Sequence, residues 1–293
     1  REDRIFDAVI FIILTLILLI VAYPLYWVII SSISAPSAVS SGKVLLHPIG
    51  FTLKGYAEVF KNDQVMRGFL NSMIITFCGV MVNLIVTLPT SYALSRSNFS
   101  GKKPITIFYL ITMFFGGGLI PTYLVIQRLQ MLNTIWALIL PGCLSVYNMI
   151  VARTFFKSNI SEELYEAAEI DGCTQARFFF QIALPLSKAI IAILVLYYGV
   201  GHWNSYFSAL VYISDKAKYP LQLVLRNILI TNQTALSQTA TTAAARAALQ
   251  EKQQLIDVMK YSLIIISSIP VLVMYPLVQK HFVKGVMIGS MKG

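Results

Sequence analysis

Charged residues are scarce in this sequence of 293 residues: only 12% are Asp, Glu, Lys or Arg, whereas 57% are hydrophobic. A soluble domain usually carries about a quarter charged residues, so this composition predicts an integral membrane protein. The mean hydropathy of +0.71 points the same way. The net charge of +10 does not indicate a nucleic-acid partner, because the basic residues are scattered at the ends of apolar runs.

Residues that could carry chemistry are also few, with three cysteines and three histidines in the whole sequence. Cys78, Cys143 and Cys173 have no metal-ligand spacing and suggest no disulfide framework, so we interpret them as packing residues. No phosphate-binding loop, zinc-protease motif or nucleophile triad pattern is present. The sequence therefore predicts a chain that is not an enzyme and binds no metal or cofactor of its own.

Long apolar runs dominate what is present. About 20 helical residues are enough to cross the hydrocarbon core of a bilayer, and six runs reach that length. The expected fold is an all-α integral membrane protein, with residues 1–293 forming one transmembrane domain. The predicted spans are residues 8–30, 69–94, 105–126, 135–156, 187–212 and 259–278. The polar segments 31–68 and 213–258 are expected to be outer loops, and 158–186 to lie in the cytosol.

The first run follows a charged start, Arg1 to Arg4, as a signal peptide would, but it is too long for a signal core and is expected to be retained. Six spans place both termini on one side. The short turn on the opposite side contributes only Arg128, whereas the turn around Lys102 and Lys103 on the terminal side is basic. Cytosolic short loops carry the excess of Lys and Arg, so both termini are expected in the cytosol.

Several predicted spans are interrupted by glycine and proline. The third contains Gly116 to Gly118 and Pro121. Interrupted backbone at membrane depth occurs where it is buried in protein or lines a cavity, so Gly117 and Pro121 are predicted to form a bend and a candidate gate. Polar residues of the second span, among them Asn83 and Thr87, favour contacts between helices over a lining for the transport pathway.

His202 lies in the fifth run, next to Trp203 and Asn204. A histidine at membrane depth is a functional candidate, so these three residues are candidates for the pathway or gate. The alternative is that His202 is an interface residue beside Trp203, and the sequence does not decide between the two.

A charged insert that favours helix separates the fourth and fifth runs. Asn159 or Ser161 can cap its first helix, and Glu162 and Glu163 fall in the first turn, where carboxylates suit the positive helix end. Gly172 is predicted to end that helix, because glycine adopts a left-handed conformation without strain.

A second helix of the insert is predicted to begin at Thr174, run through Phe178 to Ile182 and end at Pro185. Two helices joined by a glycine elbow form a rigid docking surface for another protein. The alternative is an ordinary solvated loop.

The insert also carries a family motif. Glu166-Ala167-Ala168, followed by Asp171-Gly172 and by Ile182-Ala183-Leu184-Pro185, resembles the "EAA" loop of permease subunits of binding-protein-dependent ABC importers. Cys173 stands where that family usually has alanine or another small residue.

The resemblance covers nearly the whole chain. His202 to Phe207, Tyr275 to Lys280 and Lys284 to Gly293 are similar to the last spans and tail of maltose-type sugar permeases. Phe115 to Tyr123, with Met131 to Thr134, is similar to the subgroup that imports complex or acidic oligosaccharides, such as alginate or pectin fragments.

The resemblance implies the type I importer fold, in a bacterial cytoplasmic membrane. This chain would be the maltose "G-type" half of a pore completed by a second, different permease subunit. Two ATP-binding cassette subunits would hold ATP and Mg, and an extracytoplasmic sugar-binding protein would deliver the substrate. In maltose importers the transmembrane sugar site belongs to the other half, so no sugar ligand is assigned here.

The resemblance also implies roles for particular residues. Contact with the ATPase, and transmission of its motion, is assigned to Glu162, Glu163, Glu166, Ala167, Ala168, Asp171, Gly172, Phe178 and Pro185. In the tail, Gly289, Ser290 and Lys292 are expected to contact the ATPase subunits.

The competing hypothesis is an ATP-independent secondary transporter or channel. Such a protein would show paired ionisable residues at mid-membrane and often a repeat between its halves. The sequence has only His202 at depth and no evident repeat.

Overall fold

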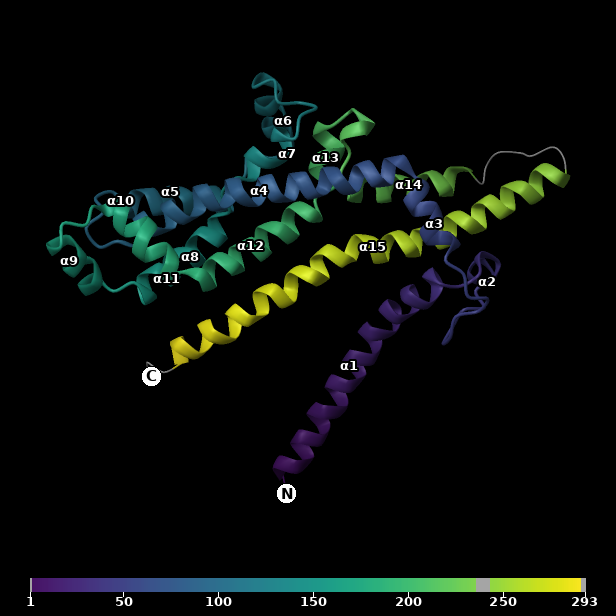
Figure 1. The fold of residues 1–293 in the computed structure, drawn as a ribbon, viewed down its shortest axis with the longest axis horizontal. Helices are drawn as coiled ribbons and strands as arrows, with labels where there is room; N and C mark the ends of the chain where they lie inside the picture. The colour runs from purple at the N-terminus through teal and green to yellow at the C-terminus, as the bar shows by residue number, and fades with distance from the viewer. Residues whose placement is uncertain (1, 236–242, 291–293) are drawn as a thin grey trace. The chain divides into compact units, whose positions relative to one another are not determined.

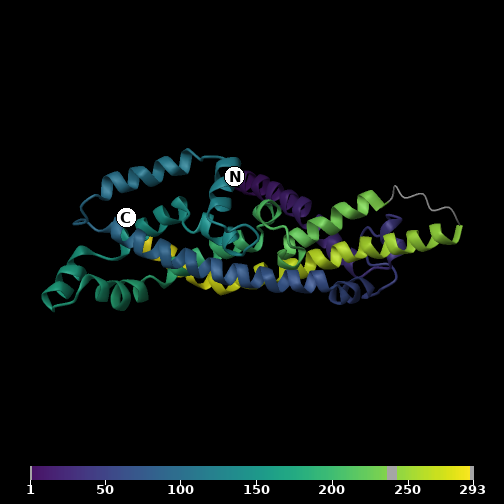
Figure 2. The ribbon, with the colours of Figure 1, turned by 90° about the horizontal axis from the view of Figure 1, so that it is seen from above.

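The computed structural model describes the backbone of residues 2–235 and 243–290, and the side chains of residues 5–230, 253–276 and 279. Every regular element in these ranges is helical, so the predicted all-α fold is confirmed. The chain divides into two compact units, Arg1–Met66 with Val224–Ile269 and Arg67–Leu223 with Pro270–Gly293. Figures 1 and 2 show the helices of both.

The first unit is built around two long helices. Its elements are α1 (Glu2–Ser32), α2 (Pro36–Ser40), α3 (Lys54–Lys61), and parts of α14 (Leu221–Ala235) and α15 (Ala243–Ser290). None of the most apolar window of α1 is buried inside the protein, as expected of a helix that faces lipid. The end of α1 is packed, since the Trp27 ring lies edge-on to Tyr261 at 5.0 Å.

The second unit holds the charged insert. Its α-helices are α4 (Asp63–Ser95), α5 (Lys102–Phe114), α6 (Leu119–Arg128), α7 (Trp136–Ile139), α8 (Val146–Asn159), α9 (Glu162–Ile170), α10 (Gln175–Phe178), α11 (Leu184–Leu186), α12 (Lys188–Trp203) and α13 (Phe207–Tyr212). Its core lies between α4, α8 and α12, where Tyr92, Phe156 and Leu194 are buried.

A polar stripe on α4 joins these helices. Asn83, Thr87 and Ser91 are spaced four residues apart, so they share one face of the helix. The Asn83 amide donates to the Gly142 carbonyl at 2.7 Å, and the Thr87 hydroxyl lies 2.7 Å from the Tyr198 hydroxyl. The Ser91 hydroxyl donates to a backbone carbonyl of α8 at 3.1 Å. The prediction that polar residues of this run connect helices is confirmed for Asn83 and Thr87, whereas Thr90 bonds only its own helix.

Three helical stretches are individually long and apolar enough to cross a membrane, namely Ile5–Ser32, Asp63–Ser95 and Gln253–Pro276. The described residues give up to six crossings if three bent helix pairs each count as one, so the number six stays a prediction. The sharpest bend, 113°, separates α5 from α6. It lies at the predicted glycine run, where Gly118 has a φ of +88°.

Two predicted boundaries differ from the helices. The run 187–212 is not one helix, because α12 ends at Trp203 and α13 begins at Phe207. The tail expected after residue 278 is not a separate segment, since the backbone of α15 continues as helix to Ser290. Residues 236–242 of the predicted outer loop 213–258 lie outside the described residues.

Candidate functional site

The charged insert begins with a helix whose cap the structure identifies. Ser161, not Asn159, is the N-cap of α9, and its hydroxyl accepts a hydrogen bond from the Leu164 backbone N–H at 3.3 Å. Glu162 and Glu163 occupy the first turn, as predicted. Capping by serine and acidic residues in this turn both stabilise a helix start, so a helix of nine residues is well defined here.

Gly172 forms the predicted elbow. Its φ is +76°, in the left-handed region. The Gly172 N–H donates to the Glu169 carbonyl at 2.9 Å, and the Cys173 N–H donates to the Ala168 carbonyl at 2.9 Å. This pair of bonds is the Schellman motif, which closes the free carbonyls at the end of α9. In both ribbon views α9 extends past the end of α4 (Figures 1 and 2).

The second helix begins as predicted and ends one residue after the predicted position. The Thr174 hydroxyl accepts from the Arg177 N–H at 3.3 Å. The predicted end at Pro185 is met to within one residue, because α11 ends at Leu186 and the chain then bends by 80°. The turn before Pro185 is a wider π-helix, Phe179–Ala183, which leaves room for the proline ring and its missing N–H.

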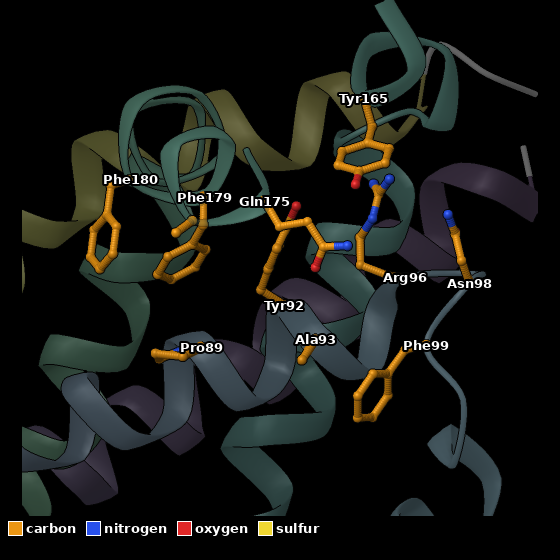
Figure 3. Close-up of a pocket in the computed structure, with 11 residues that line it drawn as sticks. Pro89, Tyr92, Ala93, Arg96, Asn98, Phe99, Tyr165, Gln175, Phe179 and Phe180 are labelled. Atoms are coloured by element: carbon orange, nitrogen blue, oxygen red, sulfur yellow. The ribbon is translucent and has the colours of Figure 1, made fainter. Parts of the chain in front are cut away.

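The inner face of α9 is joined to the residue that follows α4. Arg96 Nη2 lies 2.7 Å from Glu162 Oε2, an ion pair whose angle is not that of a hydrogen bond. The other oxygen, Glu162 Oε1, accepts from the Ser97 N–H at 3.1 Å. The Arg96 guanidinium also stacks over the Tyr165 ring, 4.0 Å from its centre (Figure 3). We call these contacts of Arg96 with Glu162 and Tyr165 the Arg96 joint.

An aromatic cluster extends the Arg96 joint to α10 and α4. The Tyr165 ring meets Phe178 edge-on at 5.2 Å, and Tyr92 of α4 lies 5.0 Å from Phe179. Phe178 is 0% exposed, so it packs inside the protein and is not a surface contact for a partner. A mainly apolar cavity of about 390 Å³ opens beside the cluster (Figure 3). α9 is therefore connected to α4 through packed side chains.

The outer face of the elbow is exposed. Ile170 is 86% exposed, and Glu166, Ala167 and Asp171 are exposed around it. An exposed aliphatic side chain flanked by carboxylates is typical of a surface that binds another protein. We call these four residues the α9 surface.

Sequence reasoning missed Ile170, Arg96 and Tyr165. Ile170 follows the acidic motif directly and could have been found as an apolar residue on the face opposite Tyr165. No sequence signal pairs Arg96 with Glu162, because the two lie in separate segments of the chain.

The candidate pathway residues fall in two places. His202 Nε2 lies 2.7 Å from Asn83 Oδ1. Trp203 is 2% exposed, with its ring edge-on to Phe69 at 5.6 Å, and Asn204 is the C-cap of α12. His202 thus contacts α4 and also lines a polar cavity, so its place in the pathway stays a prediction.

Gly117 and Pro121 lie at the exposed break between α5 and α6. Within the described residues, no hydrogen bond joins either of them to His202 or Asn204. In the tail, Gly289 and Ser290 lie in the helical backbone of α15, and Lys292 lies outside the described residues. No cluster of metal ligands occurs in the part of the chain that the structure describes.

Comparisons with known proteins agree over the full length of the chain. No protein-family model matches it. The chain is 37% identical over 292 residues to the polygalacturonan/rhamnogalacturonan transport system permease protein YtcP of Bacillus subtilis (strain 168), covering 100% of both chains. It is 38% identical over 293 residues to protein LplC of the same organism, covering 100% of this chain and 97% of that protein.

A solved structure extends the comparison to the fold. It is the crystal structure of a bacterial ABC transporter involved in the import of the acidic polysaccharide alginate. One of its chains matches with a TM-score of 0.86 and 29% sequence identity, covering 96% of this chain and 98% of that chain. These matches displace the alternative of an ATP-independent transporter or channel. The chain therefore belongs to the permease subunits of ABC transporters, among those that serve sugar transport systems.

Proposed function

We propose that this chain is one half of the transmembrane pore of an ATP-driven importer for acidic oligosaccharides of the pectin type. Similarity to the polygalacturonan/rhamnogalacturonan permease and to the alginate importer supports this substrate class. The importer would lie in a bacterial cytoplasmic membrane, with both termini of this chain in the cytosol. The basic turn at Lys102 and Lys103 would then be cytosolic, as the distribution of Lys and Arg favours.

The observation that carries the proposal is the two-sided construction of α9. Its outer side, the α9 surface with Glu163, would seat on an ATP-binding cassette subunit, where carboxylates would meet basic or amide donors. Its inner side is connected to α4 by the Arg96 joint. Ala168, Gly172, Phe178 and Pro185 would act by holding the shape of the elbow, Ala168 and Phe178 from inside the core.

The chain would catalyse nothing and bind no cofactor. ATP and Mg would be held by two ATPase subunits, and a second, different permease subunit would complete the pore. An extracytoplasmic sugar-binding protein would deliver the substrate to the outer loops, and no nucleic acid would be involved. Gly289, Ser290 and Lys292 would reach the ATPase subunits, and the candidate gate would comprise Gly117, Pro121, His202, Trp203 and Asn204.

The test is reconstitution of the purified complex in proteoliposomes with its binding protein. ATPase activity and uptake are measured with a panel of neutral and acidic oligosaccharides, including oligogalacturonides. Co-purification of an ATPase and ATP-dependent uptake of oligogalacturonides are expected. Accumulation of a solute by this chain alone, with no companion subunit, would refute the proposal.

A further inference from the structure

A polar cavity of about 400 Å³ lies within the second unit, between the α7–α8 break and α12. Its polar lining includes Ser145, Asn148, Tyr197, His202, Ser205 and Ser208. No Lys, Arg, Asp or Glu is among the described residues that line it. Hydroxyl, amide and imidazole groups without formal charge, gathered inside predicted membrane spans, suit an uncharged polar ligand or part of one.

Asn148 is the residue in this lining that most needs a partner. It is 6% exposed, and its side-chain amide forms no hydrogen bond with any residue that the structure describes. Its backbone N–H donates a hydrogen bond to the Ser145 hydroxyl at 3.4 Å, so only the side-chain amide lacks a hydrogen-bond partner. The amide is not sealed inside the protein but reaches the surface of the cavity, so its donor and acceptor are open to whatever occupies that space. The amide can therefore bind a ligand or an ordered water in the cavity.

Two polar groups beside Asn148, those of Tyr198 and His202, already have hydrogen-bond partners within the protein. The Tyr198 hydroxyl contacts the Thr87 hydroxyl at 2.7 Å and accepts from the Ser145 N–H at 3.2 Å. His202 is held by Asn83. These bonds fix the walls of the cavity, so its free groups are held in place before any ligand arrives.

Two further hydroxyls in the lining are free to bind. Among the described residues, no hydrogen bond involves the side chain of Ser205 or of Ser208. Tyr197 exposes 44% of its surface and also lines the cavity. A pyranose ring presents adjacent hydroxyls on its edge and C–H groups on its face. An amide and two serine hydroxyls can pair with the first, and an exposed aromatic ring can pack against the second.

We propose that this cavity binds the hydroxyl edge of one sugar residue of the transported oligosaccharide, with the Asn148 amide as its principal ligand. The proposal rests on the proposed function, and it departs from the expectation that only the other half of the pore contacts sugar. The lining carries no positive charge, so this cavity binds hydroxyl groups of the sugar. The carboxylates of an acidic sugar are bound by other parts of the importer.

The first experiment replaces Asn148 with leucine in the complete importer with its binding protein. Loss of one buried hydrogen bond is expected to lower uptake of trigalacturonate about tenfold. The fold-change is expected to be the same for its methyl ester, which keeps the hydroxyls and loses the charges. ATPase stimulation by the loaded binding protein should persist, because that contact lies elsewhere. Thr154→Val is the matched control, since Thr154 lies on the same helix, is exposed and bonds only its own helix, Oγ1 to Ile150 O at 2.9 Å.

The second experiment locates the sugar directly. A benzoylphenylalanine at position 208 should capture labelled trigalacturonate in the light, and the same probe at position 154 should not. Capture at 208 should fall when Asn148→Leu is added. Wild-type uptake by Asn148→Leu, or capture of the second permease subunit instead of sugar at 208, would overturn the proposal. Absence of oligosaccharide uptake by the wild-type importer would instead refute the proposed function, so the two failures are distinguishable.

Discussion

Replacing Arg96 with methionine tests whether the Arg96 joint transmits force between the ATPase and the pore. The change keeps a long side chain at a site that is only 11% exposed, and it removes the positive charge. The ion pair with Glu162 and the stacking on Tyr165 are both lost. We expect the importer to assemble and hydrolyse ATP while moving less sugar per ATP.

The size of the effect follows from the geometry. The Glu162 side chain is 41% exposed, so the ion pair is screened and contributes about 1 kcal/mol. Stacking on Tyr165 at 4.0 Å is largely shielded from water and contributes about 1–2 kcal/mol. The sum of about 2–3 kcal/mol corresponds to a change of about 30- to 150-fold in the equilibrium between attached and detached α9. Arg96→Lys keeps the charge but loses the planar stacking surface, so it should fall between wild type and Arg96→Met.

The assay measures sugar uptake and phosphate release in the same proteoliposomes, and reports their ratio. Lys103→Met is the matched control, because Lys103 is exposed, carries the same charge and lies at the start of the next helix, α5. A double-mutant cycle with Glu162→Gln should give a coupling energy of about 1 kcal/mol, since both single changes break one ion pair. A wild-type ratio in Arg96→Met, or strict additivity in the cycle, would refute the reasoning.

Three further changes test the elbow and the helix contacts. In Gly172→Pro, the proline cannot adopt the φ of +76° and lacks the N–H that bonds Glu169. Sugar uptake should be abolished while the ATPase subunits stay active, and normal uptake would contradict the elbow's role. Glu166→Lys reverses a charge on the α9 surface and should lower co-purification of the ATPase severalfold at low salt, and an unchanged yield would show that this carboxylate makes no contact. Gly79→Ala places a methyl group against the His202 ring and should destabilise the complex by about 1–3 kcal/mol in thermal unfolding. Gly201→Ala is the control, because a methyl group there meets open space. Equal melting temperatures of the two variants would count against the packing described.

The elbow was predictable from sequence because its determinants are local. A serine before two glutamates, a glycine after a short helix and a threonine before the next one each act within a few residues. The π-helix before Pro185 was not predicted, because it involves Phe179 and Ala183, which pack in the core, and core packing lies beyond local rules.

The sequence by itself determined that the protein is helical, belongs in a membrane and has a stiff elbow, because composition and capping express preferences of neighbouring residues. Only the tertiary structure decided which distant groups meet. The Ser97 N–H and Glu162 are 65 residues apart, yet they share a hydrogen bond beside the Arg96 joint. The Asn148 side chain has no hydrogen bond among the described residues, whereas the Asn83 side chain bonds both the Gly142 carbonyl and His202. Such pairings depend on how helices pack, and packing is set by the shapes of many side chains at once.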